Sequence, residues 1–353
     1  MRYKSQQSGV ALITALIITS IAVSLAGMAV YRQQIQIRLS SNISHLEQAY
    51  LYATGMEDWA GTILLRSHND HQKYDSLKDD WATLLPPIPI PGGVMNGQLF
   101  DLQARINLNS LARPKPPQNQ AQQNPNQPRQ QNQPQGNQGN QGNNRPTPPD
   151  IAAITATRLT NLIAEIDPDQ SMGPQENFVD ILSDWIDKDQ DTRDFGAESD
   201  YYQSLEPAYF APNALLATPT ELRMLKDMKK EVYEKLLEQV STLPITINTP
   251  INMNTASIEV IKAIGFDQGS AEEIIKERDI RPFRKKKEFT DYITNNSNIT
   301  VRPENFQYDV DVSSQFFLLR GNVRINNTRL FINSVLERKN GQVSVIMRDF
   351  SNP

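Results

Sequence analysis

The feature that most constrains this chain is an uninterrupted apolar run close to its N-terminus. The run extends from Val10 to Val30, 21 residues without a charged side chain. As an α-helix it would be about 31 Å long, which is close to the hydrocarbon thickness of a bilayer. A short basic leader, residues 1–9, precedes it. The sequence therefore predicts a single membrane-spanning helix over residues 10–31.

The leader also predicts where the chain is processed. A secretory signal usually has a shorter apolar core, followed by a small-x-small cleavage site. Here the expected cut, between Gly9 and Val10, lies before the apolar core, so cleavage would leave the membrane helix on the mature protein. This order resembles the class III signal of type IV pilins and type II secretion pseudopilins. An ordinary single-span anchor is the alternative.

Composition narrows the possible functions. The 353 residues carry a formal net charge of −5, which argues weakly against nucleic acid as the main partner. There is no cysteine, so disulfides and thiolate metal sites are excluded. If the leader is cytoplasmic, the bulk of the chain lies outside the inner membrane. The basic residues flanking the span hardly set this orientation by themselves: Arg2, Lys4, Arg32 and Arg38.

An apolar stripe continues beyond the membrane span. Its residues recur at spacings of three and four, the period of an amphipathic helix. One helix should therefore run from the membrane to about Leu65, and its outer half should lay an apolar face against a globular domain. The stripe consists of Ile35, Leu39, Ile43, Leu46, Tyr50 and Ala53.

The remainder of the chain reads as helices followed by strands. Asn96-Gly97 predicts a hairpin turn before a strand over Gln98–Leu111. Helices are expected around Phe178–Ile186 and from the capping box at Thr218–Glu221 to Val240. Terminal strands are expected at Phe316–Leu319, Arg329–Glu337 and Gln342–Met347, the last two joined by a hairpin at Lys339-Asn340-Gly341.

These signals give an α+β architecture in which a helical region interrupts a sheet. Residues 113–149 include a Gln/Asn/Pro/Gly tract without apolar periodicity, which predicts a disordered loop. The expected divisions are a leader (1–9), a transmembrane helix (10–31), the outer helix and first part of an α/β domain (32–112), that loop (113–149), the first part of an insertion with an acidic loop (150–205), a helical inserted domain (206–305) and the C-terminal strands (306–353).

The most informative polar cluster is acidic. Asp187, Asp189, Asp191 and Glu198 occupy positions 1, 3, 5 and 12 of a loop, the spacing of carboxylates in an EF-hand. Position 6 is Thr192, where an EF-hand needs glycine, so a true EF-hand is not expected. A calcium loop of another shape, drawing also on Asp184 or Asp200, is one interpretation. An acidic surface loop is the other.

A second constellation reads as a helix-hairpin-helix. Gly265 should end its first helix, and Ser270 with Glu273 should cap its second. Such units can present backbone N–H groups to a DNA phosphate. Glu272 and Glu273 near the helix start would repel an anion, which favours structural packing over DNA binding. DNA binding is favoured instead by a run of basic residues that follows the unit: Arg281, Arg284 and Lys285–Lys287.

Together these segments resemble one family closely, the K-type minor pseudopilin of type II secretion systems (general secretion pathway protein K). The resemblance covers nearly the whole mature chain. The segments that carry it are Gly9–Thr14, Asp101 with Ile106–Asn109, Asp184–Asp189, Gly196–Glu198 with Tyr202, Asn252–Ala256 and the terminal Ser313–Arg348.

The resemblance implies a pseudopilin fold, a long N-terminal helix on an antiparallel sheet, with an inserted α-helical domain containing helix-hairpin-helix or SAM-like units. It implies bound calcium, cleavage by a prepilin peptidase with N-methylation, and a single-pass inner-membrane protein whose bulk is periplasmic. It also implies a place at the pseudopilus tip with the I- and J-type minor pseudopilins, and contacts with other pseudopilins, the inner-membrane platform and exported proteins.

Within this resemblance, one residue indicates where the subunit lies in the pseudopilus. Most pilin-like proteins have glutamate at the fifth mature position, where it neutralises the N-terminal amine of the subunit above. Here that position is Thr14. A subunit without the acid suits a place with nothing above it. Its stripe of Ile35, Leu39, Ile43 and Leu46 would then lie partly against its own sheet and partly against neighbouring pseudopilin helices.

Two functions from different classes therefore remain open. The first is a structural subunit that starts assembly of a secretion pseudopilus. The second is a DNA-binding pilin-like protein of an uptake machine, which rests on the hairpin unit and its basic edge. An enzyme is the weakest interpretation, because no nucleophile or substrate cleft accompanies the acidic residues, and we name no catalytic residue.

Overall fold

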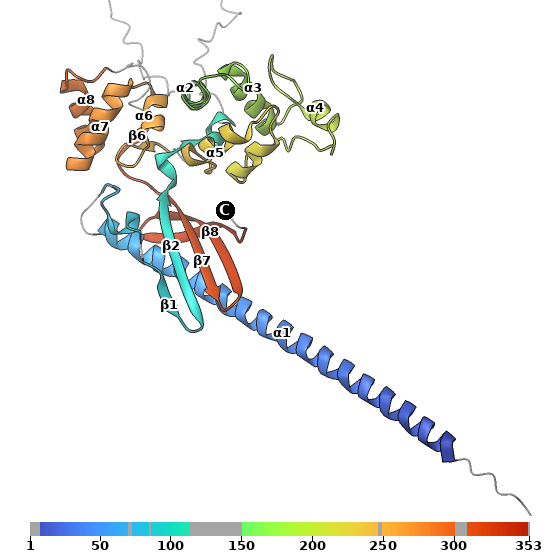
Figure 1. Cartoon of the computed structure of the whole chain (residues 1–353). Coiled ribbons are helices and arrows are strands. Elements are labelled where there is room, and N and C mark those ends of the chain that lie inside the picture. Colours follow the sequence, from blue (N-terminus) through green and yellow to red (C-terminus); the bar gives the residue numbers. More distant parts are fainter. Residues whose placement is uncertain are drawn as a thin grey trace, which may run out of the picture.

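Figure 1 shows the computed structural model of the chain, which describes residues 8–69, 73–84, 86–112, 150–245, 249–300 and 309–351. Helix α1 (Ser8–Asn69) is 62 residues long, and its N-terminal half projects away from the rest of the molecule (Figure 1). Within the described ranges it is the one helix long and apolar enough to cross a membrane. The predicted long helix is confirmed, whereas most of the leader and the predicted loop at 113–149 lie outside the described residues.

The C-terminal half of α1 crosses a five-stranded antiparallel sheet (Figure 1). The strand order is β1-β2-β7-β8-β9, so β2 pairs with β7 and everything between these two strands in the sequence is inserted. The predicted terminal strands and the hairpin at Asn340-Gly341 are confirmed, since both turn residues have positive φ. The strands are β1 (Ile88–Ile90), β2 (Gly93–Asp101), β7 (Phe316–Ile325), β8 (Thr328–Lys339) and β9 (Gln342–Asp349).

Small side chains let α1 lie close to the sheet. Its contact face carries Ala49, Ala53 and Ala60, all fully buried, and the bulkier Met56. Gly97 on β2 and Gly321 on β7 face each other in register beneath Met56. A Cβ at Gly321 would lie 2.7 Å from both the Met56 methyl group and Ile332, so a larger residue there would force these side chains to shift.

The expected turn at Asn96-Gly97 is therefore wrong. Both residues lie inside β2, where they pair in continuous register with Asn322 and Gly321 of β7 and make no turn. The hairpin between β1 and β2 turns instead at Pro91 and Gly92, where Gly92 has a φ of 78°.

The apolar stripe is divided differently from our expectation. Ile35, Leu39, Ile43 and Leu46 all remain exposed, with 47–59% of each side chain accessible, and none belongs to the core of the sheet. The buried contact begins only at Ala49, where α1 first meets the strands. No part of the four-residue stripe is thus used by the chain's own sheet, and in the described part of the chain the whole stripe stays exposed to neighbouring molecules.

A helical unit caps the end of the sheet, on the side away from the projecting half of α1 (Figure 1). It is inserted between β2 and β7, as the sequence predicts, and has its own apolar core. Its helices are α2 (Ile151–Ile166), α3 (Gln175–Ile186), α4 (Ser199–Gln203), α5 (Lys230–Gln239), α6 (Ile258–Ile264), α7 (Gln268–Ile280) and α8 (Lys286–Asn295). Short 3-10 helices lie at η1 (Asp80–Ala82), η2 (Leu102–Ala104), η3 (Leu108–Ala112) and η4 (Pro219–Met224).

Two helix boundaries differ from the sequence prediction. The helix expected from Thr218 to Val240 is split, because its first turns form only η4 and the chain reverses at Asp227, whose φ is 59°, before α5 begins. The second helix of the hairpin unit is capped by Asp267, whose carboxylate accepts a hydrogen bond from the backbone N–H of Ser270 at 2.7 Å. Ser270 therefore lies within α7.

An internal repeat organises the helical unit. The sequences Ile106-Asn107-Leu108-Asn109-Ser110 and Ile251-Asn252-Met253-Asn254-Thr255 begin at two short strands, β3 (Ile106–Asn107) and β5 (Ile251–Asn252). Each strand pairs in parallel with a strand that returns from the helices, β3 with β4 (Val240–Ser241) and β5 with β6 (Val310–Asp311).

The second asparagine of each repeat makes the same contacts. The Asn109 side chain bonds the backbone N–H and C=O of Leu216 at 2.9 and 3.0 Å, and Asn254 does the same with Phe283 at 3.0 and 2.8 Å. Because all these groups are buried, each amide satisfies backbone groups that water cannot reach. The two repeats are thus alike both in their pairing with a returning strand and in the backbone contacts of their second asparagine.

A buried polar network fastens the helical unit to the sheet. Asp101, at the end of β2, accepts hydrogen bonds through Oδ2 from Asn252, Thr255 and Ser314 at 2.6–3.0 Å. Burial raises the pKa of Asp101 to about 6, although the hydroxyl donors of Ser314 and Thr255 oppose the shift. Asn252 and Thr255 belong to the second repeat, so one carboxylate ties both parts of the molecule together.

Arg338 of β8 completes this junction. Its guanidinium pairs with Asp75 at 2.6 Å and donates to the backbone carbonyls of Leu64 and Ser314 at 3.0 and 2.7 Å. Both charged side chains are at least 95% buried. A pair this deeply buried is costly to break, because either partner left alone is an uncompensated charge.

Replacing Arg338 by alanine should therefore lower the free energy of unfolding by about 3–5 kcal/mol, because Asp75 would be left charged and buried. Urea unfolding of the full-length chain in detergent measures this. The exposed Arg324 is the matched control, and its alanine variant should change stability by less than about 0.5 kcal/mol. Equal losses in the two variants would contradict the role of the pair.

Candidate metal centre

The acidic loop lies between two helix ends. Asp187 directly follows α3, and its backbone N–H donates to Ser183 O at 3.0 Å. Glu198 directly precedes α4, and its carbonyl accepts the N–H of Tyr201 at 3.0 Å. Both ends of the loop are therefore fixed by helices that pack in the core of the helical unit, which fixes where the two carboxylates lie.

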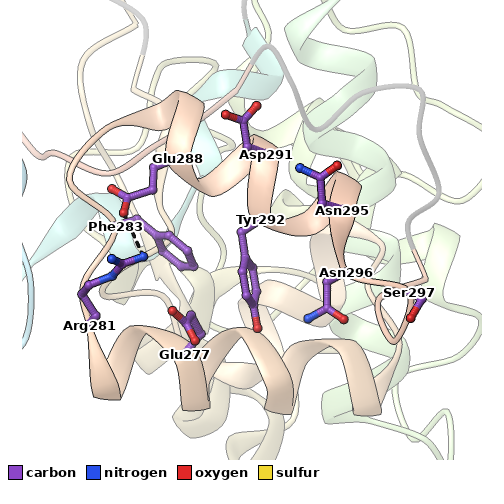
Figure 2. Close-up of a pocket in the computed structure, with 9 residues that line it drawn as sticks. All are labelled: Glu277, Arg281, Phe283, Glu288, Asp291, Tyr292, Asn295, Asn296 and Ser297. Carbon is purple, nitrogen blue, oxygen red and sulfur yellow. Dashed lines mark ion pairs between the residues drawn. The ribbon is translucent and has the colours of Figure 1, made fainter.

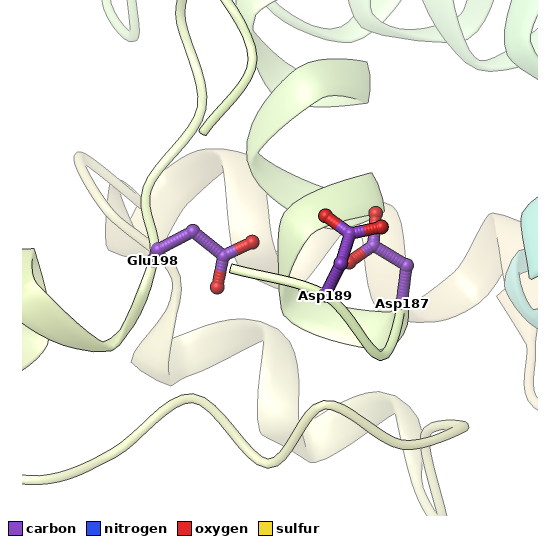
Figure 3. A group of neighbouring side chains, drawn as sticks. All are labelled: Asp187, Asp189 and Glu198. Carbon is purple, nitrogen blue, oxygen red and sulfur yellow. The ribbon is translucent and has the colours of Figure 1, made fainter. Parts of the chain in front are cut away.

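Three of the predicted residues come together. Asp187, Asp189 and Glu198 each offer a carboxylate oxygen, and these oxygens lie within 4.8 Å of one another. Figure 3 shows the side chain of Glu198, at the far end of the loop, pointing toward the two aspartates. Carboxylate oxygens at this spacing suit a hard cation such as calcium.

The burial of these oxygens strengthens this interpretation. Glu198 is only 3% exposed, and both its side-chain oxygens are buried without a hydrogen-bond partner among the described residues. One oxygen of Asp187 is in the same state. Buried carboxylate oxygens are normally satisfied, so a cation between them would remove a considerable cost.

The pKa shifts of these carboxyl groups also favour a cation site. Burial, together with the charges of Asp184, Asp187 and Asp189, raises the pKa of Glu198 to about 7. Burial also raises the pKa of Asp187, although the neighbouring Arg193 opposes that shift. The carboxylates are thus held in a place where negative charge is unfavourable without a cation.

The other predicted acids do not join the group. Asp191 is exposed, and its backbone N–H donates to Asp189 at 3.0 Å. Asp200 is exposed on α4. Asp184 is fully buried beneath Gly196, where any Cβ would lie 1.8 Å from its Oδ2, and it accepts the backbone N–H of Arg193 at 3.2 Å. Asp184 therefore shapes the loop.

Two residues at the site were not anticipated from the sequence. Arg193 forms ion pairs with Asp184 and Asp187. Asn213 donates to the carbonyl of Asp189 at 2.8 Å, from a segment more than twenty residues away. The spacing of acids in a loop gives no signal for either residue, because both contacts depend on the folded path of the chain.

A cleft between α7 and α8, of about 490 Å³, lies beside the basic run (Figure 2). Arg281 at its edge pairs with Glu288 at 3.3 Å. The lining carries more acids than bases, which does not suit a phosphate. The residues are Glu277, Arg281, Phe283, Glu288, Asp291, Tyr292, Asn295, Asn296 and Ser297.

The hairpin unit is similarly unsuited to DNA. The backbone N–H at the start of α7 that a phosphate would use is already bonded by the carboxylate of Asp267. In the basic run, Lys287 pairs with Asp291 at 2.5 Å, in addition to the Arg281 pair. The anion-binding position thus carries a negative charge of its own.

Comparison with known proteins gives one consistent family. Residues 104–245 match the family model described as type II secretion system protein K. The chain is similar to type II secretion system protein K of Pseudomonas aeruginosa, at 31% identity over 97% of this chain and 92% of the relative. It is also similar to the protein of that name from Aeromonas hydrophila, at 26% identity over 97% of this chain and 96% of the relative.

A solved structure shares the fold. The crystal structure of the GspK-GspI-GspJ complex from the enterotoxigenic Escherichia coli type 2 secretion system matches with a TM-score of 0.66 and 23% identity. The match covers 88% of this chain and 98% of that one. The predicted combination of an N-terminal apolar helix, an antiparallel sheet and additional helices is therefore confirmed.

Proposed function

Because the chain belongs to the type II secretion system protein K family and is a minor pseudopilin of that system, we propose that it occupies the pseudopilus tip. There it starts assembly together with the I- and J-type minor pseudopilins and supports export of folded periplasmic proteins. The solved complex with a similar fold contains GspK together with GspI and GspJ, which supports this choice of partners.

The observation that carries the proposal is the unequal distribution of free surface along α1. At its projecting end the helix exposes apolar side chains over several turns, including the stripe at Ile35, Leu39, Ile43 and Leu46. At its other end the sheet covers one face of the helix, and the helical unit lies beyond the end of the sheet (Figure 1). Neighbouring pseudopilin helices can therefore pack against the lower part, whereas the helical unit takes up the space that a subunit above would need.

Thr14 supports the same position. Its hydroxyl donates back to the carbonyls of Val10 and Ala11, each at 3.0 Å, so its polar group is satisfied within its own helix. After cleavage it would be the fifth residue, and it offers no carboxylate to the amine of another subunit. A subunit of this kind can be inserted below others only at an electrostatic cost, which favours the top.

We place the bulk of the chain in the periplasm. The span at the start of α1 is apolar, with no part of its most hydrophobic window buried, and it suits a single-pass anchor in the inner membrane. The leader would be cut by a prepilin peptidase before Val10 and the new N-terminus methylated. Contacts with the other pseudopilins and the membrane platform would follow from this location.

Calcium is the cofactor that the acidic loop fits best. Asp187, Asp189 and Glu198 would hold it, and the ion would supply the positive charge that their buried oxygens lack. A bound ion would fix the loop between α3 and α4 and thereby stabilise the helical unit. No catalytic step is assigned to the chain, since its relatives are components of a secretion assembly.

The stripe is tested by a charged substitution. Leu39→Glu should reduce co-purification with the I- and J-type partners and reduce secretion, because a carboxylate cannot enter an apolar helix interface. Ser41→Glu, on the opposite side of the same exposed helix, is the control and should bind normally. Both variants should still be found in the membrane fraction. Normal partner binding by Leu39→Glu would refute this use of the stripe.

Cleavage is tested at the leader. Gly9 replaced by leucine should leave a longer precursor in the inner membrane, since the peptidase site would carry a bulky residue. The mass of the purified protein shows whether residues 1–9 remain. Gln6→Leu, a bulky change elsewhere in the leader, should be processed normally. If the Gly9 variant has the mass of the mature protein, cleavage between Gly9 and Val10 is refuted.

The calcium site is tested by thermal unfolding. For the unaltered chain the melting temperature should be higher in calcium than in chelator, and an ion at 100 times its dissociation constant would contribute about 2.7 kcal/mol. Glu198→Gln should lose most of this calcium-dependent rise. Asp200→Asn, a change of the same kind on an exposed acid outside the group, should keep it. If calcium and chelator give the same melting temperature for the unaltered chain, there is no such site.

A further inference from the structure

Arg193 occupies one side of the acidic cluster. It lies in the loop between α3 and α4, and its Nη1 forms ion pairs with Asp184 Oδ1 and, at 2.6 Å, with Asp187 Oδ2. Its backbone N–H also donates to Asp184 Oδ2 at 3.2 Å. Asp184 has no exposed surface, so its charge depends on this arginine and on the backbone.

The guanidinium divides the carboxylate oxygens into two sets. Asp184 and Oδ2 of Asp187 are bonded to Arg193. Oδ1 of Asp187 and both oxygens of Glu198 are buried without a partner among the described residues. The arginine therefore leaves Oδ1 of Asp187 and the carboxylate of Glu198 without a partner in the described part of the chain, at the place in the loop where Asp187, Asp189 and Glu198 approach one another.

We propose that Arg193 is the resident counter-ion of this loop, a positioning residue that holds Asp184 and Asp187 in place and partly substitutes for the cation when none is bound. The part concerning the cation rests on the calcium site proposed above. Without the arginine, four acids would face one another uncompensated, and the loop would depend on calcium alone.

Physical chemistry supports the choice of arginine. Its charge persists at every physiological pH, and its planar group can bond two carboxylates at once. Its side chain is 40% exposed, so it reaches the cluster from the surface and its removal leaves no closed cavity. A substitution here therefore removes mainly charge and hydrogen bonds.

The test compares Arg193→Gln with Lys188→Gln in the full-length chain in detergent. Lys188 is an exposed cation of the same loop, so its variant loses the same charge without these contacts. In chelator, Arg193→Gln should melt several degrees below Lys188→Gln. In saturating calcium much of that difference should disappear. The rise in melting temperature on adding calcium should therefore be larger for Arg193→Gln than for the unaltered chain. Arg193→Lys should be intermediate in chelator.

The outcomes separate the two proposals. Equal melting temperatures of Arg193→Gln and Lys188→Gln in chelator would overturn the counter-ion role. If Arg193→Gln melts lower in chelator but gains no more from calcium than the unaltered chain, Arg193 does not take the place of the cation. If calcium changes the melting temperature of none of the chains, the calcium site is refuted. The comparison of the two variants in chelator still decides whether Arg193 positions the loop.

Discussion

The fold depends on the buried contacts of Arg338. This guanidinium reaches Asp75, the carbonyl of Leu64 at the end of α1, and Ser314 just before β7. Three parts of the chain that are far apart in sequence thus share one set of charge-assisted hydrogen bonds. Asp101 and Asn252 extend the network into the helical unit. A polar junction of this kind specifies one orientation, because a shift would leave several buried groups unsatisfied.

That rigid junction gives the molecule two unlike ends. The projecting half of α1 is apolar on its outside, and its residues beyond the membrane span still expose Ile35 and Leu39. The other end carries the sheet, and the helical unit lies beyond the end of the sheet (Figure 1). For the tip position proposed above, this asymmetry would provide an apolar helix surface for neighbouring subunits and a bulky unit at the opposite end. The acidic loop belongs to the bulky end, so calcium would stabilise the cap rather than the helix that meets the neighbours.

The sequence predicts the elements whose signals are local. The long helix and the hairpin at Asn340-Gly341 follow from patterns along the chain. The acidic group is predicted only in part, because Asp187, Asp189 and Glu198 come together whereas Asp191, which fits the same spacing, stays exposed. The turn expected at Asn96-Gly97 is wrong because both residues pair with β7, which is far away in sequence, and this pairing keeps them inside β2.

Other features could not be predicted from spacing. The contacts of Arg193, Asn213 and Arg338 depend on the folded path of the chain. The paired Asn109 and Asn254 are visible as a sequence repeat, but their purpose depends on the backbone groups of Leu216 and Phe283, which no local pattern indicates. The stripe below Ala49 is amphipathic in sequence, yet only the structure shows that the sheet begins beyond it.

Counting copies of this chain in isolated pseudopili tests the central claim most directly. A label attached at the exposed Lys230 on α5 of the helical unit can be located by electron microscopy on filaments assembled with all the pseudopilins. The account predicts a single label per filament, always at one end. Labels spaced along the filament shaft would contradict it, because the helical unit would then have to fit between stacked subunits.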